Sequence, residues 1–346
     1  MGLQIGELVP RKQIAIESLK GKIIAVDAFN TLYQFLSNIR QADGTPLMDS
    51  KGRITSHLSG LFYRNTNLMS KGLKIVYVFD GKSPDLKRDT NKGREERKRE
   101  AETKFDIAKK EGKEEDMFKY SRQTVRLTDE IIEESKALLK ALGIPIVQSP
   151  SEGESQASYI AKHDGYAVAS QDYDSLLFGA PILIQNLALS RKRKLSSGAY
   201  VPIEPETIEL EHVFNHLQIN HDQLICLGIL SGTDFNPGGI RGIGPKKALT
   251  FVQKYKHPVL IFEAVEKQLL KDGKEIWFNW QEIFELFKKP NITKEYKLDF
   301  KDVDESKVKE ILCKEHNFSE DRVSSSLDKV REAKELGKQK DLKNWF

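Results

Sequence analysis

The chain of 346 residues carries 55 Lys and Arg against 51 Asp and Glu, a net charge of +4, and 39% of its residues are hydrophobic. No apolar run is long enough to span a bilayer and the N-terminus lacks the layout of a signal peptide, so we expect an intracellular protein. The two cysteines, Cys226 and Cys313, lie far apart and the seven histidines form no H-E-x-x-H pattern, so any bound metal should be a Mg²⁺ or Mn²⁺ ion held by oxygen ligands.

Three short apolar runs rich in β-branched residues predict buried parallel strands at residues 22–26, 74–79 and 166–170. Helical patterns lie between them, including residues 56–72 and 128–143, the second closed by Gly143. The predicted fold class is therefore α/β, with a central, mostly parallel twisted sheet flanked by helices.

An aspartate follows each predicted strand: Asp27, Asp80, and then the pair Asp172 and Asp174. In open α/β sheets ligands bind outside the carboxyl ends of the strands, so these residues should converge in space. Clustered carboxylates need cations. We therefore expect a metal site at this edge of the sheet.

Residues 81–126 are charged throughout and contain few apolar residues. Their composition alone favours a solvated or partly disordered helical insertion. The segment leaves the sheet directly after Asp80, however, and Lys87 and Arg94 are seven residues apart, two turns of a helix. The two side chains could therefore share a face above the metal site.

The stretch PSEGESQ at residues 150–156 has two interpretations. Ser151 and Glu154 match the S-x-x-E capping box of a helix start. Alternatively, Glu152 and Glu154 join the metal site, but two residues this close converge only if Glu152 lies in the helix cap.

Residues 224–235 predict an apolar helix that ends at Asp234. A G-I-G-P turn follows, in which Gly242 and Gly244 expose backbone N–H groups and Lys246 and Lys247 lie in the first turn of the next helix. Such a helix-hairpin-helix-like element, over about residues 224–256, can hold a phosphate of duplex DNA without reading its bases.

Residues 257–330 are predicted to be helical and supporting, with Trp277 and Trp280 in the core. The tail, residues 331–346, is charged until its last apolar groups. Its spacing is Q-x-x-L-x-x-W-F, formed by Gln339, Leu342, Trp345 and Phe346. Exposed aromatic anchors on a charged tail are typical of partner capture, and the alternative is a last turn docked on its own domain.

These blocks resemble those of the flap endonucleases, the structure-specific 5′ nucleases, particularly the archaeal members. The segments VDAFNTLYQFL, YVFDGKSPDLK, PSEGESQAS, SQDYDSLLFG, SGTDFN, RGIGPKKAL and QKDLKNWF follow the family order over nearly the whole chain. The resemblance implies a 5′-nuclease (PIN-like) domain over residues 1–330, with the helical arch at about 81–126.

The resemblance also implies roles for individual residues. Two Mg²⁺ ions, for which Mn²⁺ could substitute, would be bound by seven carboxylates: Asp27, Asp80, Glu152 and Glu154 mainly at one ion, and Asp172, Asp174 and Asp234 at the other. Lys87 and Arg94 match the basic pair of the arch, and Tyr33 an aromatic that stacks near the scissile nucleotide. Arg40 and Arg64 are further expected DNA contacts. The terminal motif matches the peptide that docks on the sliding clamp (PCNA).

The implied activity is cleavage of 5′ flaps where single strands leave duplex DNA, with 5′–3′ exonuclease activity, in replication (Okazaki fragment processing) and repair. Nicked and gapped DNA are further expected substrates, and we expect a monomer, without membrane contact, in the cytoplasm near the nucleoid if archaeal and in the nucleus if eukaryotic. The alternatives are a related 5′ exonuclease or gap- or bubble-cutting nuclease, and a non-catalytic scaffold tethered to the clamp. The chain departs from the family at Gly153, where many members have alanine, at Ser83, where proline is common, and at the N-terminus, where no role is assigned to Gly2.

Overall fold

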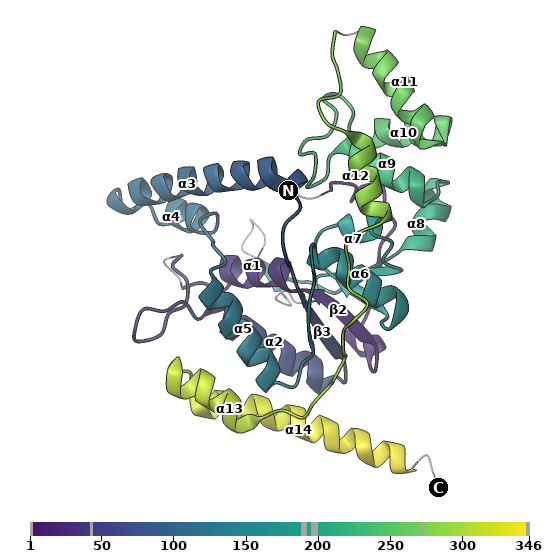
Figure 1. Ribbon diagram of the computed structural model, residues 1–346. Coiled ribbons are helices and arrows are strands. Elements are labelled where there is room, and N and C mark those ends of the chain that lie inside the picture. Colours follow the sequence, from purple (N-terminus) through teal and green to yellow (C-terminus); the bar gives the residue numbers. More distant parts are fainter. Residues whose placement is uncertain (1–2, 42–43, 188–191, 195–199, 272, 344–346) are drawn as a thin grey trace.

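The computed structural model describes residues 3–41, 44–187, 192–194, 200–271 and 273–343 (Figure 1). Its centre is a seven-stranded sheet in the order β1-β9-β6-β5-β2-β3-β4. The neighbours from β6 to β4 pair in parallel, whereas β9 pairs antiparallel with β6 and β1. The strands are β1 (Lys12–Gln13), β2 (Ile23–Asp27), β3 (Lys74–Phe79), β4 (Ile146–Gln148), β5 (Ala167–Ala169), β6 (Ile182–Gln185) and β9 (Glu206–Glu209). The predicted mostly parallel sheet is confirmed.

Alternation along the central strands divides the core between the two faces of the sheet. Ile24 and Val26 of β2 point to the face covered by α1 (Ala28–Asn38), α2 (Ser56–Ser70) and α5 (Asp129–Ala141). Ala25 points to the other face, against α6 (Gly153–His163). The register, in which Val26 pairs with both Tyr77 and Ala169, brings the carboxyl ends of β2, β3 and β5 to one edge.

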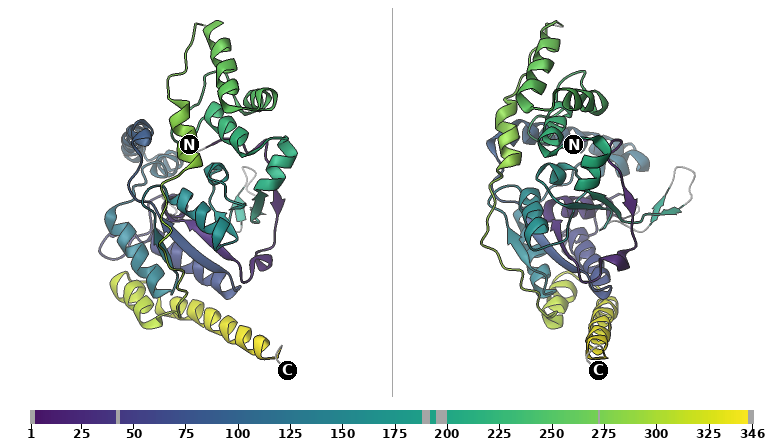
Figure 2. Two further views of the ribbon diagram at one scale, coloured as in Figure 1. Left: turned by 45° about the vertical axis from the view of Figure 1, so that its right-hand side comes forward. Right: turned by 90° about the vertical axis from the view of Figure 1, so that its right-hand side faces the viewer.

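The charged insertion is helical and projects from that edge (Figures 1 and 2). It consists of a 3₁₀ turn (Asp85–Lys87), α3 (Arg88–Lys110) and α4 (Glu114–Ser121). The end of α4 is tied to the loop after α1, because the hydroxyl of Ser121 and the guanidinium of Arg40 both donate to the carbonyl oxygen of Gly44, at 2.8 and 2.9 Å. The insertion is thus helical over most of its length, and its far end is tied back to the body.

A helical lobe stands above the sheet edge and has a second core of its own (Figure 1). Its helices are α7 (Asp174–Leu177), α8 (Leu210–Leu217), α9 (His221–Ser231), α10 (Pro245–Tyr255), α11 (Pro258–Lys271) and α12 (Trp280–Lys288), and a hairpin of β7 (Lys192–Lys194) and β8 (Tyr200–Pro202) precedes α8. The apolar helix ends at Ser231, three residues before Asp234. Trp280 stacks on Phe262, with ring centroids 4.2 Å apart, but the expected core position of Trp277 is wrong because it is 60% exposed.

The chain returns from this lobe to the body in an extended segment, residues 289–304, where helix was expected. Its backbone is docked directly: Thr293 exchanges two hydrogen bonds with the side-chain amide of Gln156, and Lys301 donates to the carbonyl oxygen of Gly143. The core on this side of the sheet also includes residues of three short elements: helix α13 (Glu305–Lys309), a π-helical turn (Glu310–Glu315) and the 3₁₀ helix η1 (Ile16–Leu19).

Helix α14 (Glu320–Lys343) packs on α2, contributes Val323 and Leu327 to the core, and continues without a break past residue 331. The expected start of the tail therefore falls inside a helix. In the described part of the chain, no helix combines the length and apolar character that crossing a membrane requires.

Candidate metal-dependent nuclease site

The carboxylates at the ends of the strands each accept a hydrogen bond that fixes their orientation. Asp27 ends β2 and accepts a hydrogen bond from the N–H of Asn30 at 3.0 Å, which makes it the N-cap of α1. Asp80 follows β3 and accepts from the N–H of Gly153 at 2.5 Å. Asp172 follows β5 and accepts from the side-chain amide of Asn30 at 3.0 Å. These contacts bring three strand ends and the start of α6 together.

The start of α6 decides between the two interpretations of PSEGESQ. The N-cap of α6 is Glu152, and the capping box of Ser151 and Glu154 is not formed. Ser149 takes the local hydrogen bonds instead, accepting from the N–H of Ser151 at 3.2 Å and donating to the carbonyl oxygen of Glu152 at 2.9 Å. Glu154 accepts from the N–H of Ser175 at 3.1 Å, so its carboxylate faces the Asp172 to Asp174 turn.

Gly153 has a steric role that the amino-acid sequence alone did not reveal. A Cβ atom at this position would lie 2.4 Å from an oxygen of the Asp80 carboxylate. The glycine therefore allows Asp80 to reach the backbone N–H at the start of α6.

Three residues of the arch converge on Asp234, which lies after α9. Lys87 pairs with Glu152 and lies 3.4 Å from Asp234, and one guanidinium nitrogen of Arg94 lies 2.8 and 2.7 Å from the two carboxylate oxygens of Asp234. The hydroxyl of Thr90 donates to the carbonyl oxygen of Asp234 at 2.6 Å. The helical spacing thus brings Lys87 and Arg94 onto one face. Thr90 was missed, although its position three residues after Lys87 and four before Arg94 places it on the same face of the helix.

Burial, followed by repulsion between neighbouring carboxylates, sets the ionisation of the site. The pKa of Asp27 and that of Asp174 are each raised to about 8, and that of Asp80 to about 6. The same two causes raise the pKa of Glu154 and of Asp172. Burial would raise the pKa of Asp234 as well, but Lys87 and Arg94 outweigh it and lower that pKa. The metal-free site thus holds protons that a bound cation would replace.

The donor chemistry of the site fits hard divalent cations. The candidate ligand atoms are all carboxyl oxygens, from the seven residues that the resemblance implies, and these groups outnumber the two cations, Lys87 and Arg94. Within the described residues no three His, Cys, Asp or Glu side chains are yet spaced to hold an ion. Two of the seven carboxylates are paired with cations of the insertion instead, Glu152 with Lys87 and Asp234 with Arg94.

The residues expected to contact DNA are distributed around this site. Tyr33, on α1, is 38% exposed, and Lys98 of the arch lies over its ring, 5.5 Å from the centroid. Arg40 is half-buried and bound to carbonyl oxygens of its own loop, and burial lowers its pKa. Arg64 lines a small cavity with Gln34 beneath α1.

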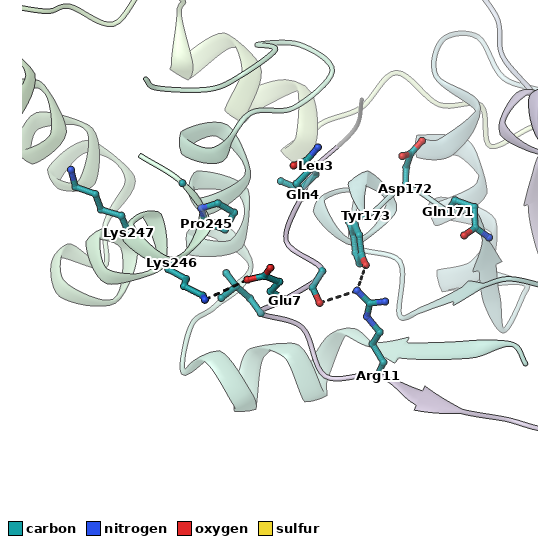
Figure 3. Close-up of a pocket in the computed structure, with 13 residues that line it drawn as sticks. Leu3, Gln4, Glu7, Arg11, Gln171, Asp172, Tyr173, Pro245, Lys246 and Lys247 are labelled. Carbon is teal, nitrogen blue, oxygen red and sulfur yellow. Dashed lines mark hydrogen bonds and ion pairs between the residues drawn. The ribbon is translucent and has the colours of Figure 1, made fainter. Parts of the chain in front are cut away.

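The turn before α10 has the conformation that its sequence predicts. Gly242 has a φ of +88°, Gly244 is the N-cap of α10, and Pro245 is its first residue. Lys246 is exposed and lies 3.4 Å from Glu7. A cavity of about 910 Å³ extends from this turn to Asp172 and Tyr173, with the N-terminal segment along one side (Figure 3).

The expected clamp-binding residues cannot be placed. Gln339 and Leu342 lie within α14, but their side chains are outside the described part of the structure. Trp345 and Phe346 lie beyond the described residues.

Comparison with known proteins agrees with this geometry. The XPG N-terminal domain matches residues 4–101, and the XPG I-region matches residues 143–234. Flap endonuclease 1 of Thermococcus onnurineus is 51% identical over 348 aligned residues, which cover 100% of this chain and 99% of the relative. The chain belongs to the flap endonuclease 1 family. It is accordingly a metal-dependent nuclease.

Solved structures show the same fold. The flap endonuclease-1 of Methanococcus jannaschii superposes with a TM-score of 0.75 at 40% identity, covering 96% of this chain and 98% of that one. The catalytic core of Rad2 in complex with DNA substrate superposes with a TM-score of 0.69 at 20% identity, covering 94% and 97% of the two chains. The second likeness is one of fold alone.

Proposed function

We propose that this protein cleaves 5′ flaps at the junction of single-stranded and duplex DNA, with two Mg²⁺ ions as cofactors and Mn²⁺ as a possible substitute. The observation that carries the proposal is the meeting of seven carboxylates with Lys87 and Arg94 of the arch at the carboxyl edge of the sheet. Membership of the flap endonuclease 1 family supports the same activity.

Two groups of carboxylates would hold the ions. Asp27, Asp80, Glu152 and Glu154 would serve mainly one ion, and Asp172, Asp174 and Asp234 the other. The bound ions would supply a water of lowered pKa and stabilise charge on the phosphoryl group. The raised pKa values of Asp27 and Asp174 support this assignment, since such carboxylates bind either protons or cations at neutral pH.

The basic pair of the arch would act on the substrate phosphate. Lys87 and Arg94 now neutralise Glu152 and Asp234, and with those carboxylates bound to ions both cations become available to the phosphoryl oxygens. They would stabilise the charge that develops in the transition state. Burial against Phe235 keeps the Lys87 ammonium partly dry, 5.1 Å from the ring centroid, which strengthens its electrostatic effect.

Duplex DNA would be gripped through its phosphates. The backbone N–H groups at Gly242 and Gly244 and the ammonium groups of Lys246 and Lys247 suit one strand, and these contacts carry no base sequence. Tyr33, Arg40 and Arg64 would contact DNA beside the active site, with Tyr33 stacking near the scissile nucleotide. The structure of the Rad2 core with its DNA substrate supports a DNA-binding role for the shared fold.

The C-terminal residues Gln339, Leu342, Trp345 and Phe346 would bind the sliding clamp, and the nuclease alone would be a monomer. We further propose that it acts in replication and repair, on flapped, nicked and gapped DNA. If the source is archaeal, it would do so in the cytoplasm near the nucleoid.

Product mapping on a double-flap junction tests the proposal, with Mg²⁺ and then with a chelator. We expect cleavage near the base of the 5′ flap that the chelator abolishes. Blunt duplex and bubble substrates of the same sequence serve as comparisons, and a preference for either would favour the related exonuclease or bubble-cutting activities. Flap cleavage that survives in the Asp80→Asn/Asp174→Asn double variant would refute the two-metal mechanism.

A further inference from the structure

The N-terminal segment, residues 3–11, lies against the turn that carries Asp172 and Asp174 (Figure 3). It contacts this turn at two points. The backbone N–H of Leu3 lies 3.4 Å from a carboxylate oxygen of Asp174, and a guanidinium nitrogen of Arg11 donates to the hydroxyl of Tyr173 at 2.6 Å. A segment remote in sequence thus holds the residue between two expected metal ligands.

Arg11 is itself held from three directions. The nitrogen that binds Tyr173 also donates to the carbonyl oxygen of Gly6 at 2.8 Å, and the second terminal nitrogen lies 3.5 Å from the carboxylate of Glu206 on β9. The guanidinium carbon lies 5.7 Å from the centroid of the Tyr173 ring. These contacts fix the orientation of the side chain, although it is partly exposed.

The hydroxyl of Tyr173 points toward Arg11, whereas the carboxylate of Asp172 points away from it (Figure 3). Tyr173 is the N-cap of the short helix α7, which begins at Asp174. Because Tyr173 lies between the two aspartates, a contact that holds its side chain limits rotation of the backbone from which both carboxylates extend. The contact with Arg11 therefore resists movement of both.

Gly6 is fitted to this contact. A Cβ atom there would lie 2.4 Å from the guanidinium nitrogen of Arg11 and 2.6 Å from the hydroxyl of Tyr173. Both are ends of flexible side chains, so a methyl group would separate the pair without obstructing the backbone. Gly6 offers a way to break the contact while both functional groups stay in the chain.

We propose that Arg11 is a positioning residue, which acts through Tyr173 to hold Asp172 and Asp174 at the spacing that binds the second cation. The inference rests on the proposed function. Arg11 touches neither carboxylate in any contact given by the described structure, so its effect should fall on metal affinity rather than on the chemical step. Groups that orient metal ligands from outside typically change affinity by about 10- to 100-fold when removed.

The test is direct Mn²⁺ binding to the full chain, followed by the electron paramagnetic resonance signal of free Mn²⁺. Tyr173→Phe, Arg11→Gln and Gly6→Ala should each weaken one of the two Mn²⁺ sites by about tenfold. The Arg11→Gln/Tyr173→Phe double variant should be no weaker than the single variants, because both remove the same contact. Lys12→Gln, which removes a neighbouring exposed positive charge from β1, should bind Mn²⁺ as the wild type does.

Flap cleavage provides the second readout. The Mg²⁺ concentration for half-maximal activity should rise by the same factor in the three variants, while the rate at saturating Mg²⁺ and the KM for DNA stay within about twofold. A higher KM with unchanged Mn²⁺ binding would make Arg11 a DNA contact, and a lower Tm with unchanged Mn²⁺ binding would make it a structural residue. Either result overturns the proposal.

The failures of the two proposals are distinguishable. If the wild type neither binds Mn²⁺ nor cleaves flaps, the proposed function falls. If the wild type does both and the three variants match it, only the positioning role of Arg11 falls.

Discussion

One guanidinium nitrogen of Arg94, on helix α3, contacts both carboxylate oxygens of Asp234, at 2.8 and 2.7 Å. Thr90 binds the carbonyl oxygen of the same aspartate, so the first two turns of the arch and Asp234 form one unit. A change in the charge of Asp234 should therefore alter its contacts with α3, and a displacement of α3 should alter the position of Asp234.

Replacing Arg94 should slow cleavage. In Arg94→Ala the transition state loses a cation, and we expect single-turnover flap cleavage at saturating Mg²⁺ to fall by about 100-fold or more. The matched control is Arg88→Ala, on the same helix, whose side chain is 71% exposed and pairs with Asp85; its rate should stay within about threefold. Equal losses in the two variants would mean that only the general charge of the arch matters.

Removing a carboxylate should stabilise the metal-free protein while it abolishes activity. Asp174→Asn keeps an oxygen that can accept from the N–H of Leu3 but removes the repulsion with Glu154, Asp172 and Asp234. We expect the metal-free Tm to rise by roughly 1–2 °C, which corresponds to about 1 kcal/mol in a chain of this length. Asp106→Asn, at an exposed position of α3, should change neither Tm nor activity. A lower Tm in Asp174→Asn would show that the carboxylates stabilise the metal-free fold.

The Tm difference between Asp174→Asn and the wild type should increase with pH. Burial raises the pKa of Asp174 from 3.8 to about 8 in the folded protein, so between these values the folded state holds a proton that the unfolded state releases. Raising the pH through this window destabilises the metal-free wild type relative to Asp174→Asn. The Tm difference should be small at pH 5 and larger at pH 8.5, and saturating Mg²⁺ should reduce it. A difference that does not depend on pH would contradict the assignment of the proton to Asp174.

The terminal motif can be tested without its structure. Deletion of residues 339–346 should leave cleavage of short free flap substrates within about twofold, because Val323 and Leu327, which α14 contributes to the core, lie well before the deletion. Stimulation by the sliding clamp should disappear, as should binding of the clamp to the immobilised nuclease. Lys340→Ala in the intact chain is the matched control and should keep both. Loss of basal cleavage on deletion would instead indicate a tail docked on its own domain.

The sequence predicted the positions of site residues correctly where these positions follow from backbone geometry alone. Parallel strands end at a common edge, so Asp27, Asp80 and Asp172 could be expected to converge from strand positions alone. The spacing of Lys87 and Arg94 likewise follows from helix geometry. These rules concern the backbone, and they hold whichever side chains pack around it.

Contacts between side chains of segments far apart in the sequence could not be predicted from local sequence patterns. Arg11 and Tyr173 are 162 residues apart, and nothing in either local pattern predicts their hydrogen bond. The S-x-x-E pattern at Ser151 indicated a capping box. In the structure Glu154 instead accepts a hydrogen bond from the backbone N–H of Ser175, on another element, which the local pattern does not reveal. Trp277 was expected in the core on its apolar character alone, and its position at the edge of the helical lobe leaves it exposed.

For two glycines within helices, helix propensity alone predicts the same effect of substitution by alanine, but their surroundings predict different effects. Helix propensity gives Gly60→Ala and Gly93→Ala the same sign, a stabilisation of about 0.5–1 kcal/mol. At Gly93, in α3, the nearest atom to an added Cβ is 3.8 Å away, so propensity should prevail and local protection of α3 against hydrogen exchange should increase. At Gly60, in α2, the Cβ would lie 2.3 Å from the buried ring of Phe35, and relieving that overlap should cost about 1–3 kcal/mol, more than propensity gains. Denaturant unfolding of the two variants should therefore show a clear loss for Gly60→Ala and none for Gly93→Ala, and a stable Gly60→Ala would mean that α1 and α2 can separate to admit a methyl group.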